Sequence, residues 1–211
     1  MNLLTTPFEK DLTDTPLAEY PRPNLQRDSY LCLNGKWEIK IESANEQLYK
    51  GEILVPFPVE SKLSGIGKTF PLDSLYTYTR TFSLPTGFKK DRVILNFGAV
   101  DNETQVYVNG SFVGANIGGY IPFSFDITDY LNEENNILRV EVTYFMDVKF
   151  PYGKQTENRG GMWYTRVSGI CICDNIKCSD IVSVNAHFLI YKCSDRLSVD
   201  IQLHRNGIIG I

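Results

Sequence analysis

Residues 105–114 read QVYVNGSFVG, and they give the clearest signal of fold class in this chain. Apolar and polar residues alternate on both sides of the dipeptide Asn109-Gly110, which predicts two antiparallel strands joined by a two-residue turn. Both turn residues must adopt positive φ there, and asparagine and glycine tolerate that conformation better than other residues. The stretch therefore predicts a β-hairpin.

Similar alternating runs lie on both sides of this hairpin. Residues 76–84 and 137–144 alternate cleanly, and shorter runs cover residues 37–41 and 93–97. Helical periodicity is almost absent, and we expect a single short turn of helix near residues 126–131. Many short strands separated by turn residues predict an antiparallel sandwich or barrel.

The composition excludes several classes of function. The chain has 211 residues, 43% of them hydrophobic, and a net charge of −4, which argues against a nucleic-acid partner. It contains no basic cluster typical of membrane-surface binding, no apolar run near the roughly 20 residues of a membrane span, and no signal-peptide pattern at its start. We therefore expect a cytoplasmic protein.

The cysteines suggest neither a metal site nor a disulfide framework. Three of the five cluster at Cys171, Cys173 and Cys178, which invites a zinc interpretation. However, no second Cys pair or nearby His completes the usual four ligands. We expect reduced, partly buried thiols, with no metal and no cofactor.

A long polar stretch between two predicted strands is the candidate binding site. Residues 144–170 are too long for an ordinary connection and too aromatic for a disordered one, which favours a shaped, ligand-facing loop. Sugars bind to aromatic rings surrounded by amide and guanidinium donors. This loop offers such groups, and the alternative for its tryptophan is a place in the core. The candidate substrate-binding residues are Gln155, Asn158, Arg159, Trp163, Tyr164 and Arg166.

The chain divides into three parts on sequence grounds. Residues 1–24 contain four prolines and are expected to form an extended arm, and residues 25–176 hold most of the predicted strands. Residues 177–211 add two alternating runs, too few to bury a core of their own. We expect these residues to be the opening of a truncated further domain, and to self-associate through their unpaired edges.

Several ordered motifs carry a family resemblance. The stretches LNGKW (33–37), VPFPVESKLSG (55–65), VYVNG (106–110) and PFSFDI (122–127) resemble the N-terminal sugar-binding domain of family 2 glycoside hydrolases. That group includes β-galactosidases and β-glucuronidases. The resemblance implies a jelly-roll β-sandwich of the galactose-binding kind, followed here by the first strands of an incomplete immunoglobulin-like domain. In the family, a TIM barrel carries both catalytic glutamates, and jelly-roll loops complete its sugar pocket.

Two features depart from the family pattern. Typical β-galactosidases carry an Asp directly before Met-Trp, where it helps to hold the sugar and a sodium ion, whereas this chain has Gly161. After the family-like Ser168-Gly-Ile170, residues 171–178 read CICDNIKC, and their charge breaks the alternation. We expect the last strand of the jelly roll to be weak or rerouted.

The resemblance implies a non-catalytic sugar-binding domain, whose full-length form hydrolyses terminal β-linked sugars. A retaining glycosidase needs two carboxyl groups about 5 Å apart. No pair in this chain can be identified as such, and Asp101 and Glu103 are interpreted as a solvated pair at the start of a strand. We assign no catalytic residue, and expect carbohydrate and the TIM-barrel domain of the parent protein as partners. The alternative is a stand-alone carbohydrate-binding or assembly module without hydrolase activity.

Overall fold

The computed structural model describes most of the first 179 residues, and strands dominate it. It covers residues 7–18, 29–89, 91–146, 149, 155–156, 164–172 and 175–179; residues 7, 8, 164, 165, 171, 172 and 175–179 are described by their backbone alone. The helical segments in this part are short 3-10 turns: η1 (Pro7–Asp11), η3 (Lys62–Ser64) and η4 (Thr128–Tyr130). None of the described helices could cross a membrane.

The larger sheet has six strands, all antiparallel to their neighbours. In spatial order they are β3 (Glu46–Val55), β2 (Gly35–Ser43), β4 (Leu75–Phe82), β10 (Asn136–Thr143), β7 (Glu103–Val108) and β8 (Ser111–Ile117). Alternate residues along β4 and β10 are buried, because only one face of the sheet lies against the core. The alternating patterns of these two strands are thereby confirmed.

The smaller sheet has four antiparallel strands and pairs the first described strand with the last one. Its order is β1 (Tyr30–Cys32), β14 (Asn175–Ser179), β5 (Arg92–Phe97) and β9 (Phe123–Asp126). A short ladder, β6 (Ala99–Asp101) with β13 (Gly169–Ile172), continues the pairing of β5 with β14 beyond a break in register. A parallel pair, β11 (Gln155–Thr156) with β12 (Tyr164–Thr165), lies apart from both sheets.

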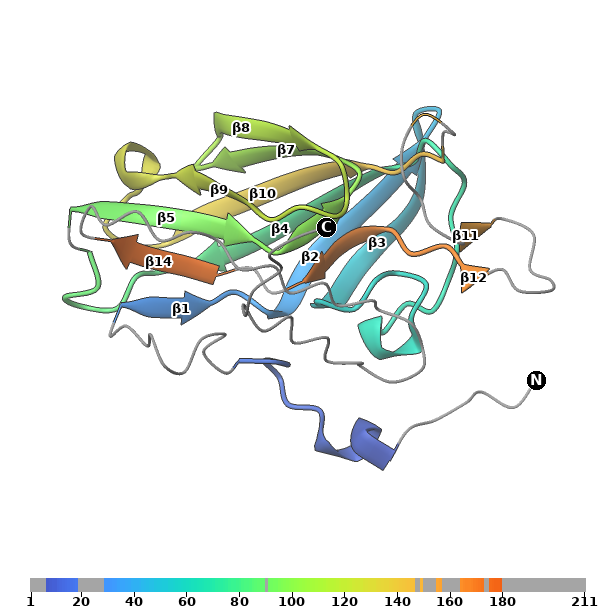
Figure 1. Ribbon diagram of the computed structural model, residues 1–211, viewed down its shortest axis with the longest axis horizontal. Coiled ribbons are helices and arrows are strands. Elements are labelled where there is room, and N and C mark those ends of the chain that lie inside the picture. Colours follow the sequence, from blue (N-terminus) through green and yellow to red (C-terminus); the bar gives the residue numbers. More distant parts are fainter. Residues whose placement is uncertain are drawn as a thin grey trace, which may run out of the picture.

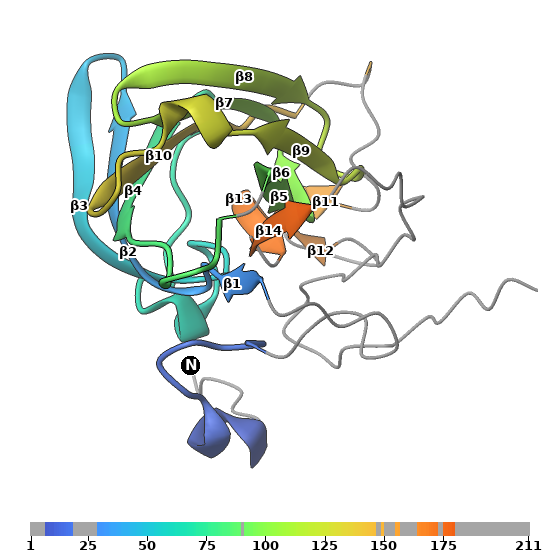
Figure 2. The same cartoon turned by 90° about the vertical axis from the view of Figure 1, so that its left-hand side faces the viewer.

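The two sheets form the layers of a β-sandwich. Figure 1 shows β5, β14 and β1 side by side across one layer, and Figure 2 shows the six-stranded sheet curving around the other side of the molecule. Large apolar side chains from both layers fill the space between them, including Trp37, Ile39, Tyr78, Leu95 and Val140, each at most 2% exposed. The expected all-β sandwich is confirmed, and Trp37 belongs to its core.

The predicted hairpin forms as expected between β7 and β8. Asn109 and Gly110 adopt φ values of 51° and 84° at its turn. The side chain of Asn109 also donates from Nδ2 to the carbonyl oxygen of Tyr130 and to Oδ1 of Asn136, each at 2.8 Å. Its own Oδ1 accepts from the backbone N–H of Ile137 at 2.8 Å. The turn is therefore anchored to the start of β10.

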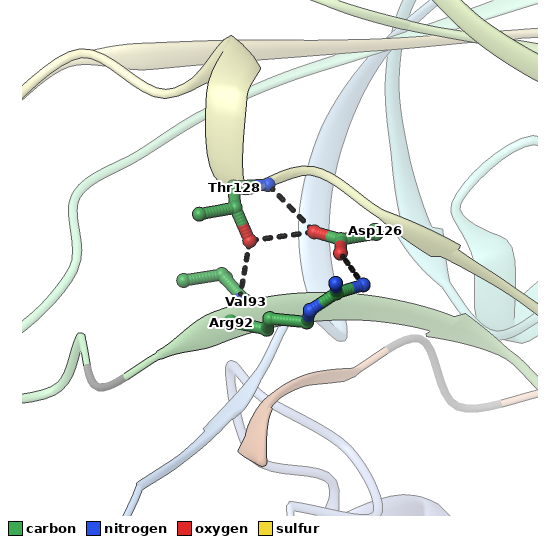
Figure 3. A network of polar contacts seen from close by, with 4 residues as sticks. All are labelled: Arg92, Val93, Asp126 and Thr128. Atoms are coloured by element: carbon green, nitrogen blue, oxygen red, sulfur yellow. Dashed lines mark hydrogen bonds and ion pairs between the residues drawn. The ribbon is translucent and has the colours of Figure 1, made fainter. Parts of the chain in front are cut away.

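A polar network fixes the end of β9 against β5 (Figure 3). Arg92 pairs with Asp126 at 2.9 Å, and the hydroxyl of Thr128 donates to Asp126 and accepts from the backbone N–H of Val93. Burial by itself would raise the pKa of Asp126, but the hydrogen bonds from Thr128 and the charge of Arg92 outweigh it and lower that pKa. The partners of Asp126 in this network all lie within the protein, which indicates a structural role for this carboxylate.

Residues 7–18 pack against the sandwich itself. The side-chain amide of Asn34 donates to the carbonyl oxygen of Pro16 at 2.9 Å, and both residues are buried. The carbonyl oxygen of Asp14 passes so close to Gly35 that a Cβ there would lie 2.8 Å from it. An exposed ion pair between Lys62 and Glu9, 3.7 Å long, adds a third contact.

The last described strand, β14, belongs to the sandwich although most of it lies within residues 171–178, where charged residues break the alternation. The register of β13 shifts between Ile170 and Ile172, and the chain then continues as β14 between β1 and β5. The boundary expected between residues 176 and 177 thus falls inside β14. The expected immunoglobulin-like fragment spans residues 177–211, and its residues from 180 onward lie outside the described residues.

Candidate functional site

The candidate site lies where the chain passes from one sheet to the other. Asp101 ends β6, which pairs with β13, whereas Glu103 begins β7 in the six-stranded sheet. Asn102 joins them and is buried. Its Oδ1 accepts a hydrogen bond from the backbone N–H of Phe145 at 2.8 Å. Its carbonyl oxygen accepts a hydrogen bond from the backbone N–H of Gly118 at 2.9 Å. These bonds hold three segments at this corner.

The interpretation of Asp101 and Glu103 as a solvated pair is wrong. Glu103 is exposed, but Asp101 is only partly exposed, because the change of sheet at Asn102 separates the two side chains. The Oδ1 atom of Asp101 is buried and has no hydrogen-bond partner among the described residues. It lies under the backbone of Gly119, where any Cβ would come within 2.4 Å of it. Burial, and secondarily the charge of Glu60, raises the pKa of Asp101 to about 7.

A second carboxyl group, that of Glu60, lies in the segment between β3 and η3, and its charge acts on Asp101. It accepts from the hydroxyl and the backbone N–H of Ser168, at 2.6 and 3.2 Å. Burial raises the pKa of Glu60, although these hydrogen bonds and the charge of Arg166 act in the opposite direction. Glu60 thus ties residue 168 to a part of the chain that lies far away in sequence.

Arg166 is the cation of this group. It is 6% exposed, it donates to the carbonyl oxygen of Phe70, and its guanidinium lies 5.6 Å from the ring centre of Tyr144. We call Glu60, Asp101, Tyr144, Arg166 and Ser168 the corner cluster.

Buried tyrosines complete the surroundings of the corner cluster. The hydroxyl of Tyr144 is buried without a hydrogen-bond partner among the described residues, and burial, followed by the charge of Asp101, raises its pKa. Burial likewise raises the pKa of Tyr76 to about 12. A buried polar atom without a partner in the protein needs an explanation, and a bound water or ion is one of them.

The end of β8 and the segment after it form an exposed rim beside the corner cluster. Ile117, Tyr120 and Ile121 are 62%, 39% and 63% exposed, which is high for large apolar residues so close together. Gly119, between them, covers Asp101, and the charge of Tyr120 acts on Tyr144. The rim therefore brings an exposed aromatic ring next to two buried polar groups.

The structure describes three of the six predicted site residues, namely Gln155, Tyr164 and Arg166. Gln155 accepts from the backbone N–H of Val167 at 2.7 Å, so its side chain holds the segment that carries Arg166. The backbone of Tyr164 pairs with that of Gln155. Asn158, Arg159 and Trp163 lie outside the described residues. The structure thus brings Gln155 close to Arg166, and the partners of both that it describes lie within the protein.

The predictions from sequence missed the assembly of the corner cluster. Glu60 and Asp101 were only two of several nominal carboxylates, and nothing in their spacing links them to each other or to residue 168. The one available signal was Ser168 within the family-like motif. Among the described residues, no three His, Cys, Asp or Glu side chains are grouped as metal ligands.

The fold and the cluster define a jelly-roll β-sandwich domain with a polar corner between its sheets. The family model described as "Glycosyl hydrolases family 2, sugar binding domain" matches residues 22–172. The chain therefore belongs to this family and contains its sugar-binding domain. This confirms the resemblance seen in the sequence motifs.

Named relatives are whole enzymes of which the chain matches a small part. It is 42% identical over 67 residues to a β-galactosidase of Thermoanaerobacter pseudethanolicus, covering 31% of this chain and 9% of that protein. It is 28% identical over 141 residues to a β-galactosidase of Clostridium acetobutylicum, covering 52% and 16%. A solved β-glucuronidase of Bifidobacterium dentium shares the fold, with a TM-score of 0.55, 19% identity, and coverage of 74% of this chain and 31% of that one.

Proposed function

We propose that the corner cluster and its rim form part of a pocket for a terminal β-linked sugar, in a protein that hydrolyses such sugars. The carrying observation is Asp101, a partly exposed residue whose buried Oδ1 has no hydrogen-bond partner among the described residues and lies under the backbone of Gly119, next to Tyr120 in the sequence. A site of this kind supplies acceptors for sugar hydroxyls and an aromatic ring for an apolar sugar face. The similarity of the chain to β-galactosidases supports this proposal.

The catalytic carboxylates of such a protein would come from another domain. Both oxygens of Glu60 already accept hydrogen bonds from Ser168, so this carboxylate is not placed to act as a nucleophile. Asp101 lacks a second free carboxylate beside it among the described residues. The exposed isoleucines 117 and 121 offer apolar contact surface on which a catalytic domain could close the pocket.

The proposal is tested by NMR titration of the whole chain with methyl β-galactoside and methyl β-glucoside. We expect binding in the millimolar range, about −4 kcal/mol, because half of the pocket would be missing. Backbone signals of residues 101–102 and 117–121 should shift. Asp101→Ala should abolish the shifts, whereas Asp126→Ala, which removes a carboxylate of the Figure 3 network, should leave them unchanged.

Two results would contradict this proposal. Shifts confined to residues remote from the corner would place the sugar elsewhere, and micromolar affinity would favour the stand-alone carbohydrate-binding module. Nitrophenyl β-glycosides should not be hydrolysed by the purified chain. Hydrolysis that disappears on mutating one of its own carboxylates would show that catalysis does not need another domain.

A further inference from the structure

We propose that the corner cluster selects neutral sugars and rejects sugar acids. This inference rests on the proposed function and adds a substrate class to it. Both neutral and acidic sugars occur in the names of similar proteins, which include β-galactosidases and β-glucuronidases. The balance of charge at the corner distinguishes the two classes for this chain.

The first step is a comparison of charges. The corner cluster contains two carboxyl groups, those of Glu60 and Asp101, and among the described residues Arg166 is the cation whose charge acts on Glu60 and Tyr144. Arg166 is buried and donates to the carbonyl oxygen of Phe70. A sugar carboxylate bound here would add a further negative charge to a site whose described residues hold more acidic than basic groups. Like charges placed together at a binding site are a strong source of discrimination.

The second step concerns hydroxyl groups. A sugar hydroxyl can donate to a carboxylate oxygen or accept from a protonated carboxyl group, so it fits Asp101 in either state. The unpartnered Oδ1 of Asp101 and the hydroxyl of Tyr144 make the corner a place where an added hydroxyl or water satisfies buried polar atoms. The carboxylate of a sugar acid can only accept hydrogen bonds, and at high pH the ionised Asp101 is also only an acceptor, so the two cannot bond to each other. A site built to bind hydroxyl groups discriminates strongly against a ligand that leaves its polar groups unpaired.

The third step is the surroundings of Asp101, since its charge changes near neutral pH. The charge of Glu60, from the segment before η3, acts on Asp101, and the charge of Asp101 acts on Tyr144, which follows β10. Tyr120 of the rim and Arg166, from the segment before β13, act on Tyr144, and Glu60 and Arg166 also act on Tyr76 of β4. Burial raises the pKa of Asp101 to about 7. The carboxyl group is therefore mostly ionised at pH 8 and neutral at pH 5.5, and discrimination against acids should weaken as pH falls.

The experiment compares methyl β-glucoside with methyl β-glucuronide, which differ only in having CH₂OH or a carboxylate on the sugar ring. Binding of each to the whole chain is measured by NMR at pH 8 and pH 5.5, and the glucuronide stays ionised at both. We expect the glucoside to bind at least about tenfold more tightly at pH 8. The ratio should fall severalfold at pH 5.5.

Variants separate the effect of Asp101 from that of the total charge. Asp101→Asn removes the ionisable group with little change in shape, so it should lower the ratio at pH 8 and abolish its pH dependence. Asp126→Asn makes the same change of charge at the exposed Arg92 network and should behave like wild type. Wild-type protein at the two pH values provides the same test should Asp101→Asn unfold.

The outcomes are distinct. Equal or tighter binding of the glucuronide at pH 8 overturns the inference but leaves sugar binding at the corner intact. A ratio that changes equally in both variants also overturns it, because total charge would then suffice. Failure of both sugars to bind at the corner removes the proposed function and this inference with it.

Discussion

At the scale of single residues, close packing at the corner requires two glycines, because a side chain at either position would collide with a neighbouring residue. A Cβ on Gly119 would lie 2.4 Å from Oδ1 of Asp101, and one on Gly169 would lie 2.1 Å from the hydroxyl oxygen of Tyr78. Gly169 also has a φ of 88°, which residues with a side chain rarely adopt. These glycines let the two sheets and the rim meet without a gap.

Gly169→Ala should therefore destabilise the fold through two separable effects. We expect a loss of about 2 to 4 kcal/mol, part from overpacking against Tyr78 and part from positive φ. In a Tyr78→Phe background the nearest remaining atom would be the ring carbon at 3.2 Å, so the penalty should fall to about 1 to 2 kcal/mol. Urea unfolding of the four proteins in this double-mutant cycle measures the difference. Identical penalties in both backgrounds would show that the hydroxyl group is not the obstacle.

Asp101 should make stability depend on pH. Its pKa in the folded protein, about 7, lies above the value near 3.9 expected in the unfolded chain, so the folded state binds the proton more tightly. The resulting stabilisation is fully present below about pH 4 and is lost as pH rises to about 7. Asp101→Asn should flatten this part of the profile in urea unfolding experiments.

Asp126 supplies the contrasting case, since its pKa is lowered in the folded state. Its stabilisation is present above the unfolded value and disappears as pH falls, so Asp126→Asn should lower stability at neutral pH and remove a slope of the profile at acid pH. A wild-type profile that is flat between pH 4 and 7 would contradict the environment described for Asp101.

At the scale of elements, local patterns predicted the strands well but not the corner cluster. The hairpin at Asn109-Gly110 and the alternation along β4 and β10 follow from local backbone and burial preferences. The bonds from Ser168 to Glu60 join residues 108 positions apart. No periodic pattern encodes such a pairing, and the change of sheet at Asn102 reversed the expectation for Asp101.

The segment at residues 7–18 offers a test of what one buried hydrogen bond contributes. Asn34→Ala removes the donor to the carbonyl oxygen of Pro16, so the segment should detach while the sandwich stays folded. Hydrogen exchange and limited proteolysis within residues 7–18 should both become faster, at the cost of only a few degrees in melting temperature.

Glu9→Gln is the matched control for the same segment. It breaks an exposed ion pair with Lys62, and such pairs contribute little to stability. Exchange in residues 7–18 should therefore match wild type. Faster exchange in Glu9→Gln but not in Asn34→Ala would show that the ion pair, and not the hydrogen bond to Pro16, anchors residues 7–18.

At the scale of the whole molecule, the smaller sheet depends on β14, which lies between β1 and β5. The match to the family model ends at residue 172, before β14 begins. A chain of residues 1–179 should unfold cooperatively. A chain of residues 1–172 lacks β14, so β1 and β5 lose the strand that lies between them, and this chain should melt at a much lower temperature. Thermal unfolding followed by circular dichroism compares the two, and equal melting temperatures would show that β14 contributes nothing to the fold.

The position of β14 also sets the order in which the chain can fold during its synthesis. Tyr30 in β1 pairs with Lys177, so one of the first strands to leave the ribosome finds its partner only after almost all of the domain has been made. At ordinary rates of translation this delay is on the order of ten seconds. Meanwhile the hairpin of β7 and β8 can form from neighbouring residues. We therefore expect the six-stranded sheet to form first on the nascent chain, with β1 unpaired and open to chaperones until the last strand emerges.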